Sequence, residues 1–267
     1  MNHPAFIICL KRLRGQMCQQ RLPILKEIFP HNLTGISPAV DAALLDIKTD
    51  SRVSAFAKYH TIKSVDVDYM HLSKKSAIGC SLTHIGLWQK SVDLNEPIFI
   101  IEDDVELDKK FITTAVQRIP NNVDHAALIY LPFVDRSLCS EYWCKVNPRQ
   151  SFGGTQMYFI TPKGARILLK QALPIVSEID QYMGYVAATE RNYSSVFYKE
   201  QYLTSYKVMS TQIFVPSTMH RNFSFRKILP ENNMFYIAII IIYILMCYKI
   251  SIQSTCRKKQ KVKSSIV

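Results

Sequence analysis

The stretch that decides the fold reads Pro97-Ile98-Phe99-Ile100-Ile101-Glu102-Asp103-Asp104-Val105. Four consecutive apolar residues follow the proline, and such a run is typical of a strand that is buried on both faces of a sheet. Three acidic residues come directly after it. Because ligands bind beyond the carboxyl ends of strands in open α/β sheets, the sequence predicts a binding site at these acids.

The three adjacent carboxylates repel one another and need a compensating charge in a compact fold. Mg²⁺ and Mn²⁺ prefer carboxylate oxygens and keep positions open for phosphate, so a divalent cation would supply that charge. A solvated acidic turn before the next helix is the alternative. Both interpretations stay open on these residues alone.

Strand patterns and helix patterns alternate along the rest of the chain, which predicts an α/β fold. The expected strands are 6–10, 126–131 and 156–160, and the expected helices are 17–29, 76–92, 109–119 and 162–173. We expect residues 11–15 to form a basic turn. We also expect Ser76, Asp108 and Thr161 to cap helices, and Asp180 to open a further short helix.

The chain has seven cysteines and no CxxC pair, which argues against a zinc ribbon. Cys9 and Cys80 lie in apolar segments, where we expect buried thiols. Cys139 and Cys144 are close enough in sequence to form a disulfide in an oxidising compartment, and free thiols fit equally well.

The net charge of +12 suggests a nucleic-acid partner, but its distribution argues against one. Half of it lies in residues 234–267, which hold six basic residues and no acid. The rest of the chain has no dense basic stripe. The charge therefore indicates a membrane-proximal tail. The apolar segment Ala5–Leu10 is too short for a signal peptide, and its basic residues follow it.

Met234–Tyr248 carries no charge and would span roughly 22 Å as a helix. Continuing it to Ile252, with Lys249 extended toward the headgroups, brings it closer to the thickness of a bilayer. We therefore expect a domain over 1–230, a single membrane-anchoring helix over 234–252 and a basic tail over 253–267. A buried terminal helix is the alternative, and the side of the membrane stays open.

Several blocks of the chain together resemble glycosyltransferase family 25, which includes bacterial lipo-oligosaccharide galactosyltransferases and collagen galactosyltransferases. The resemblance runs over roughly residues 5–216. Its blocks are Ile7-Ile8-Cys9-Leu10 with Arg12, Ala39-Val40-Asp41, Ala77-Ile78-Gly79-Cys80-Ser81-Leu82-Thr83-His84 with Trp88, Ile101-Glu102-Asp103-Asp104-Val105, Gly154-Thr155 with Tyr158-Phe159-Ile160, and Gly164-Ala165. Ser177-Glu178-Ile179 departs from the proline-containing turn that the family has at this point.

The resemblance implies a GT-A fold, a Rossmann-like mixed sheet flanked by helices that binds a UDP-sugar through a metal ion. It implies that Glu102 and Asp104 hold Mn²⁺ or Mg²⁺, and that Asp180 is the catalytic base of an inverting transfer. The residues that it places around the donor are Ile8, Leu10, Arg12, Asp41, Gly79, Cys80, Ser81, His84, Asp103, Gly154 and Thr155.

The leading hypothesis is an inverting, metal-dependent transfer of galactose or glucose from a UDP-sugar to a hydroxyl on a glycan, lipid or protein. A metal-dependent phosphoesterase is a second class, because acid clusters also bind paired metals. The sequence has no second cluster of the kind that such enzymes use. A catalytically inactive, membrane-anchored interaction protein is the third hypothesis, and the departure before Asp180 keeps it open.

Overall fold

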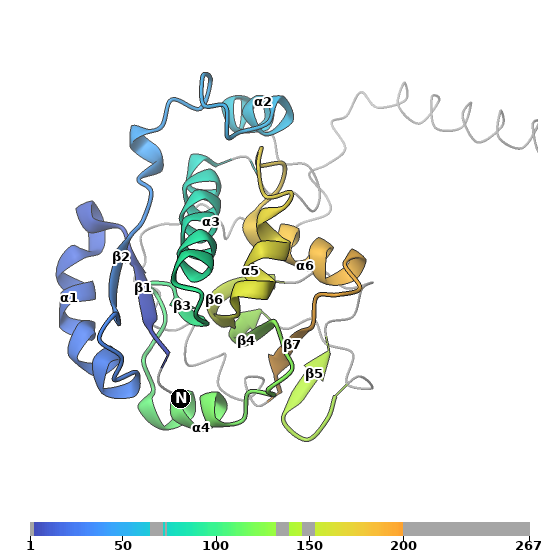
Figure 1. Ribbon diagram of the computed structural model, residues 1–267. Helices are drawn as coiled ribbons and strands as arrows, with labels where there is room; N and C mark the ends of the chain where they lie inside the picture. Colours follow the sequence, from blue (N-terminus) through green and yellow to red (C-terminus); the bar gives the residue numbers. More distant parts are fainter. Residues whose placement is uncertain (1–2, 65–71, 73, 132–138, 146–152, 200–267) are drawn as a thin grey trace, which may run out of the picture. The chain divides into compact units, whose positions relative to one another are not determined.

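The computed structural model describes residues 3–64, 72, 74–131, 139–145 and 153–199, which all lie in one compact unit, Met1–Ile213. Within these residues the chain forms a seven-stranded mixed sheet in the order β2-β1-β3-β6-β4-β7-β5 (Figure 1). The strands are β1 (Ala5–Cys9), β2 (Gly35–Pro38), β3 (Ile98–Ile101), β4 (His125–Leu131), β5 (Trp143–Lys145), β6 (Gly153–Ile160) and β7 (Ser195–Tyr198). The helices are α1 (Lys11–Ile28), α2 (Ala55–Lys63), α3 (Lys75–Leu94), α4 (Lys109–Gln117), α5 (Pro162–Leu169) and α6 (Ile179–Thr189), with a short 3₁₀ helix η1 (Ala42–Leu44).

The direction of the strands determines which residues meet at the edge of the sheet. β1 pairs in parallel with β2 and β3, and β4 pairs in parallel with β7. β6 lies antiparallel between β3 and β4, with Ile101 opposite Met157. The start of β6 therefore lies beside the carboxyl end of β3.

The strand predicted over 98–101 is confirmed, and all four side chains of β3 are fully buried. Ile98 and Ile100 pack in a core that includes residues of α3, α5 and α6. Phe99 and Ile101 pack in a second core with α1 and α4. Successive side chains of a strand point to opposite faces, so these two cores lie on opposite faces of the sheet. Helices therefore cover both faces (Figure 1).

The predicted start of the first helix is wrong. α1 begins at Lys11, so the basic residues expected in a turn belong to its first turn, and the helix continues through Gly15 and Pro23. Pro23 lies inside α1, where it cannot donate the usual backbone hydrogen bond.

Two of the three predicted helix caps are confirmed. The Asp108 carboxylate accepts a hydrogen bond from the amide of Phe111, and the Thr161 hydroxyl accepts one from the amide of Gly164. The cap predicted at Ser76 is wrong, because α3 starts one residue earlier and Lys74 is its N-cap residue.

Four of the cysteines in the described part of the chain form disulfides. Cys139 and Cys144 are bonded, the alternative that an oxidising compartment favours. Cys9 is bonded to Cys18, so the expected buried thiol at Cys9 is wrong. Cys80 is a free thiol, as expected, and is partly exposed.

Among the residues that the structure describes, no helix is long and apolar enough to cross a membrane. The anchoring helix expected over 234–252 and the tail over 253–267 lie outside the described residues.

Gly79 allows α3 to approach the loop that follows β2. A Cβ atom at this position would lie 2.7 Å from the carbonyl oxygen of Val40 and 3.0 Å from the Cβ of Ala42. A backbone carbonyl cannot move aside as the end of a flexible side chain can. The close contact therefore requires glycine at position 79, whatever the site binds.

We predict that Gly79→Ala lowers the free energy of unfolding by roughly 1–3 kcal/mol, because the added methyl group overpacks this contact. Gly86→Ala is the matched control on the same helix, since a methyl group added there would meet no heavy atom within 4 Å. The control is expected to be neutral or stabilising by up to about 1 kcal/mol. Urea unfolding of both variants measures the difference, and equal stabilities would contradict the packing role.

Candidate active site at the carboxyl end of β3

The three acids after β3 point to different neighbours. The alternation of the strand places Glu102 on the same face as Ile100, toward α3, and Asp103 on the same face as Ile101, toward α1. The hydrogen bonds of the two side chains agree with this division. Adjacent carboxylates are thereby separated across the sheet.

The charge of Asp103 is compensated by α1 and the turn before it. Its carboxylate accepts a hydrogen bond from the backbone amide of Leu10, at 3.4 Å, and forms an ion pair with Arg14. Arg21 donates to the carbonyl oxygens of Asp103 and Val105, at 2.6 and 2.9 Å. Asp103 therefore joins the acidic segment to the start of α1.

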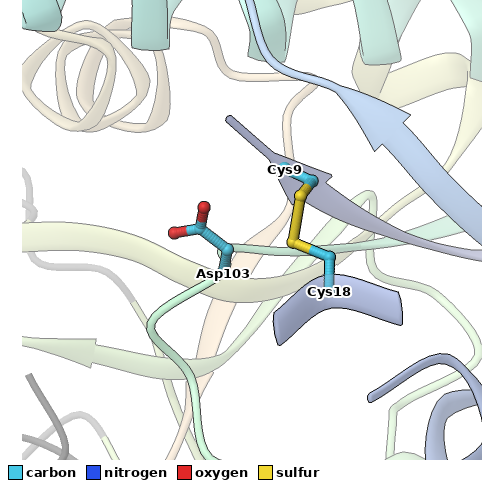
Figure 2. Close-up of side chains that lie close together, drawn as sticks. All are labelled: Cys9, Cys18 and Asp103. Carbon is cyan, nitrogen blue, oxygen red and sulfur yellow. A yellow bond between two sulfur atoms is a disulfide. The ribbon is translucent and has the colours of Figure 1, made fainter. Parts of the chain in front are cut away.

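The Cys9–Cys18 disulfide lies beside this contact and connects the end of β1 to α1 (Figure 2). Its two sulfur atoms and a carboxylate oxygen of Asp103 all lie within 4.8 Å of one another. Both sulfurs are already bonded to each other, so they offer no thiolate ligands. The cluster braces the turn before α1 and is not a metal site.

Glu102 contacts α3 and β6. Its Oε1 atom accepts a hydrogen bond from the hydroxyl of Thr155 at 2.6 Å and lies 3.6 Å from Nε2 of His84. Burial favours the neutral acid, but the imidazole of His84 and the hydroxyl of Thr155 outweigh it, so the pKa of Glu102 is lowered. Glu102 is therefore an ionised carboxylate at neutral pH.

Asp104 is the acid whose charge is least compensated. Its Oδ1 atom is buried and has no hydrogen-bond partner among the described residues. Burial, followed by the negative charges of Glu102 and Asp103, raises the pKa of Asp104 to about 6. A cation beside it would relieve this cost.

The negative charges of Asp180 and of the acids after β3 both raise the pKa of the Cys80 thiol. Burial raises the pKa of Cys80 well above its usual value, and the negative charges of Glu102, Asp180, Glu178 and Asp104 raise it further. Asp180 lies in the first turn of α6, and its carboxylate accepts a hydrogen bond from the amide of Gln181. Carboxylates that are far apart in sequence are therefore within electrostatic range of one atom.

The residues proposed to hold a metal fit that role. The buried Oδ1 atom of Asp104 lacks a partner among the residues described, and Glu102, two residues earlier, is ionised. Carboxylate oxygens are the ligands that Mg²⁺ and Mn²⁺ prefer. A divalent cation would supply the missing positive charge.

The other predicted donor-site residues divide into two groups. Leu10, Cys80, His84 and Thr155 lie at or beside the acid cluster through the contacts above, and Ile8 and Gly154 belong to strands β1 and β6 that end or begin there. Arg12 and Asp41 are instead paired with each other, at 2.8 Å.

Ser81 faces a pocket of about 210 Å³ that includes space open to solvent. Its other walls come from Ile85 on α3, the segment before α6 and the start of α6. Its volume is below the roughly 300 Å³ at which small-molecule pockets begin. We therefore assign no ligand to this pocket.

Four residues near the acids were not predicted as site residues: Arg14, Arg21, Trp88 and Tyr158. Trp88 and Tyr158 belong to the blocks that resemble the family, but no role was assigned to them. The Tyr158 hydroxyl lies 2.8 Å from Nδ1 of His84 and accepts a hydrogen bond from Nε1 of Trp88 at 2.9 Å. His84, Trp88 and Cys80 are spaced four residues apart on α3, so their helical spacing could have indicated one shared face. No sequence signal connects the two arginines to Asp103.

We predict that Asp104→Asn stabilises the metal-free protein at pH 7 by roughly 1–3 kcal/mol, because it removes a buried, uncompensated charge. An unfolded aspartate titrates near pH 4, and Asp104 does so at about 6 in the folded chain. The folded state therefore binds more protons in this window, and the stability of the wild type falls as the pH rises from about 4 to about 6.

Urea unfolding in the presence of a chelator, from pH 4 to 7, measures this difference. The gain from Asp104→Asn is expected to vanish near pH 4, where both side chains are neutral. A difference that is constant over this range would contradict the raised pKa.

The model of the family described as glycosyltransferase family 25 (LPS biosynthesis protein) matches residues 3–136. The match covers β1 to β4 and includes the acid cluster. It ends before Thr155 and Asp180, whose places are known from the structure alone. No curated protein matches the chain.

Proposed function

The chain belongs to glycosyltransferase family 25, and on this premise we propose that it transfers a hexose, galactose or glucose, from a UDP-sugar to an acceptor hydroxyl with inversion at the anomeric carbon. The acceptor would be a hydroxyl group of a glycan, a lipid or a protein. The family is described as one of lipopolysaccharide biosynthesis.

The observation that carries the proposal is the convergence of carboxylates around Cys80. Glu102 and Asp104 come from the end of β3, and Asp180 comes from the start of α6, yet all three act electrostatically on this thiol. A sugar-transfer site needs negative charge in two roles, one to hold a cation and one to accept a proton. The convergence supports both roles at one edge of the sheet.

Glu102 and Asp104 are the residues that would hold Mn²⁺ or Mg²⁺. When bound, such an ion would stabilise the negative charge that develops on the departing diphosphate. α1 starts directly after β1 at this edge, and a helix N-terminus favours phosphate groups. Asp103, held by Leu10 and Arg14, fixes that helix start relative to the acids.

Asp180 is the proposed catalytic base. In the transfer, the acceptor oxygen forms a bond to the anomeric carbon while the bond from that carbon to the UDP oxygen breaks. The carboxylate of Asp180 takes the proton of the acceptor hydroxyl. The hydrogen bond from the amide of Gln181 fixes one carboxylate oxygen, at 2.7 Å.

The apolar run 234–252 and the basic residues after it support the further proposal that the chain is attached to a membrane through this segment. An anchor of this kind would keep the enzyme close to a lipid-linked acceptor.

We predict that Asp104→Asn and Asp180→Asn each lower kcat for UDP-sugar turnover by about 10²–10⁴-fold, since each removes a carboxylate that acts in the transfer. The measurement is release of UDP from UDP-galactose and UDP-glucose, with an acceptor mixture and with Mn²⁺ or Mg²⁺. Asp180→Asn is expected to leave the donor KM unchanged, because the base acts on the acceptor.

Asp93→Asn is the matched control, because Asp93 lies near the far end of α3 and contacts Gln89. Full activity in either test variant would remove the role assigned to that residue. A wild-type protein that binds UDP-sugar without turning it over with any acceptor would instead support the inactive interaction protein.

A further inference from the structure

Cys80, His84 and Glu102 form a compact group of metal-ligating side chains. One donor atom from each lies within 4.8 Å of the others. Cys80 and His84 are one helical turn apart on α3, and Glu102 follows β3. Residues four apart share one face of a helix, so α3 presents a sulfur and an imidazole toward the same carboxylate.

The side chain of His84 is fully buried, yet its Nε2 atom has no hydrogen-bond partner in the described part of the chain. Nε2 lies 3.6 Å from Oε1 of Glu102, which is longer than a hydrogen bond. Buried polar atoms are nearly always partnered, so this nitrogen indicates a missing ligand.

The rest of the imidazole is held in place. Nδ1 lies 2.8 Å from the hydroxyl of Tyr158, and that hydroxyl also accepts a hydrogen bond from Trp88. A metal-bound histidine usually has its second ring nitrogen held in this way, which fixes the direction of the first. The Tyr158 hydroxyl oxygen can accept a hydrogen bond from Nδ1–H when Nε2 is a ligand, because a hydroxyl oxygen has two lone pairs.

The spacing suits a tetrahedral ion. Bonds of about 2.0–2.3 Å to nitrogen, oxygen and sulfur place neighbouring ligand atoms roughly 3.3–3.7 Å apart. The distance of 3.6 Å between Nε2 and Oε1 falls in this range. Cys80 forms no disulfide and the residue is partly exposed, so its sulfur is available as a ligand.

The donor set selects the type of ion. Mg²⁺ and Mn²⁺ prefer oxygen ligands, whereas a thiolate and an imidazole with one carboxylate suit Zn²⁺ or Co²⁺. We propose that Cys80, His84 and Glu102 bind one divalent cation of this borderline class, with Zn²⁺ as the best fit. Binding displaces the thiol proton of Cys80 to solvent.

This inference deepens the proposed function and rests on it for the role of the ion, though not for its binding. Glu102 belongs to both donor sets, whereas Asp104 belongs only to the first. A zinc ion on Cys80, His84 and Glu102 would lie at the same edge of the sheet as the proposed sugar transfer.

The test uses the full chain with Cys247→Ser and Cys256→Ser, so that Cys80 is the one cysteine outside the two disulfides. Co²⁺ is titrated into chelator-treated protein, and the near-ultraviolet absorption of a thiolate–Co²⁺ bond is recorded. We expect this band at one Co²⁺ per chain and its loss in Cys80→Ser. His84→Gln should weaken Co²⁺ affinity at least about 10-fold.

Zn²⁺ should displace Co²⁺ at lower concentrations than Mn²⁺ does. Zn²⁺ should also slow the alkylation of Cys80 in proportion to the fraction of sites that hold Zn²⁺. This measurement needs no substitution of a ligand residue. Absence of the band, its persistence in Cys80→Ser, or alkylation that Zn²⁺ does not slow would each overturn the proposal.

Asp104→Asn separates this inference from the proposed function. The variant should keep the thiolate–Co²⁺ band, because Asp104 is not in the ligand group, while it loses UDP-sugar turnover. A chain that turns over UDP-sugar but shows no band would overturn the zinc site alone. A chain that shows the band but has no transferase activity would overturn the proposed function alone.

Discussion

The structure depends on how three adjacent carboxylates are accommodated at the end of a fully buried strand. β3 is buried on both faces, and the side chains of Glu102 and Asp103, which follow it, are only 24% and 14% exposed. The alternation of the strand directs Glu102 to α3 and Asp103 to α1. Each of these two acids has partners of opposite charge or hydrogen-bond donors there, and Asp104 is left with a raised pKa. That remaining charge is the basis for expecting a cation at this edge.

The antiparallel strand β6 brings the rest of the site to the same edge. Because β6 runs opposite to β3, its first residues lie beside the last residues of β3, and Thr155 reaches Glu102 although 53 residues separate them. Tyr158, opposite Ile100 in the register, holds His84 from the sheet side. A parallel strand in this place would bring its carboxyl end to the acids and would carry Thr155 to the opposite edge.

The sequence predicted the parts of the fold that depend on local patterns. The buried strand at 98–101 follows from its continuous apolar run, and the caps at Asp108 and Thr161 follow from short polar side chains that begin a helix. The blocks of residues that resemble the family also include the acids of the candidate site, whose assigned roles stay predictions.

Features that depend on long-range contacts were missed. The basic residues at 11–14 resembled a solvated turn, but the ion pair between Arg14 and Asp103 stabilises them as the first turn of α1. The Cys9–Cys18 disulfide requires the end of β1 to meet α1, which no spacing rule specifies. The contact of His84 with Tyr158 likewise depends on the placement of β6.

The central claim is that a divalent ion at these carboxylates assists the binding of a nucleoside diphosphate. Calorimetric titration of UDP into the chain, with Mn²⁺ or Zn²⁺ and then with chelator, tests it most directly. The account predicts one UDP per chain with the ion present and much weaker binding after chelation. Equal affinity with and without the ion, or no binding of UDP under either condition, would contradict it.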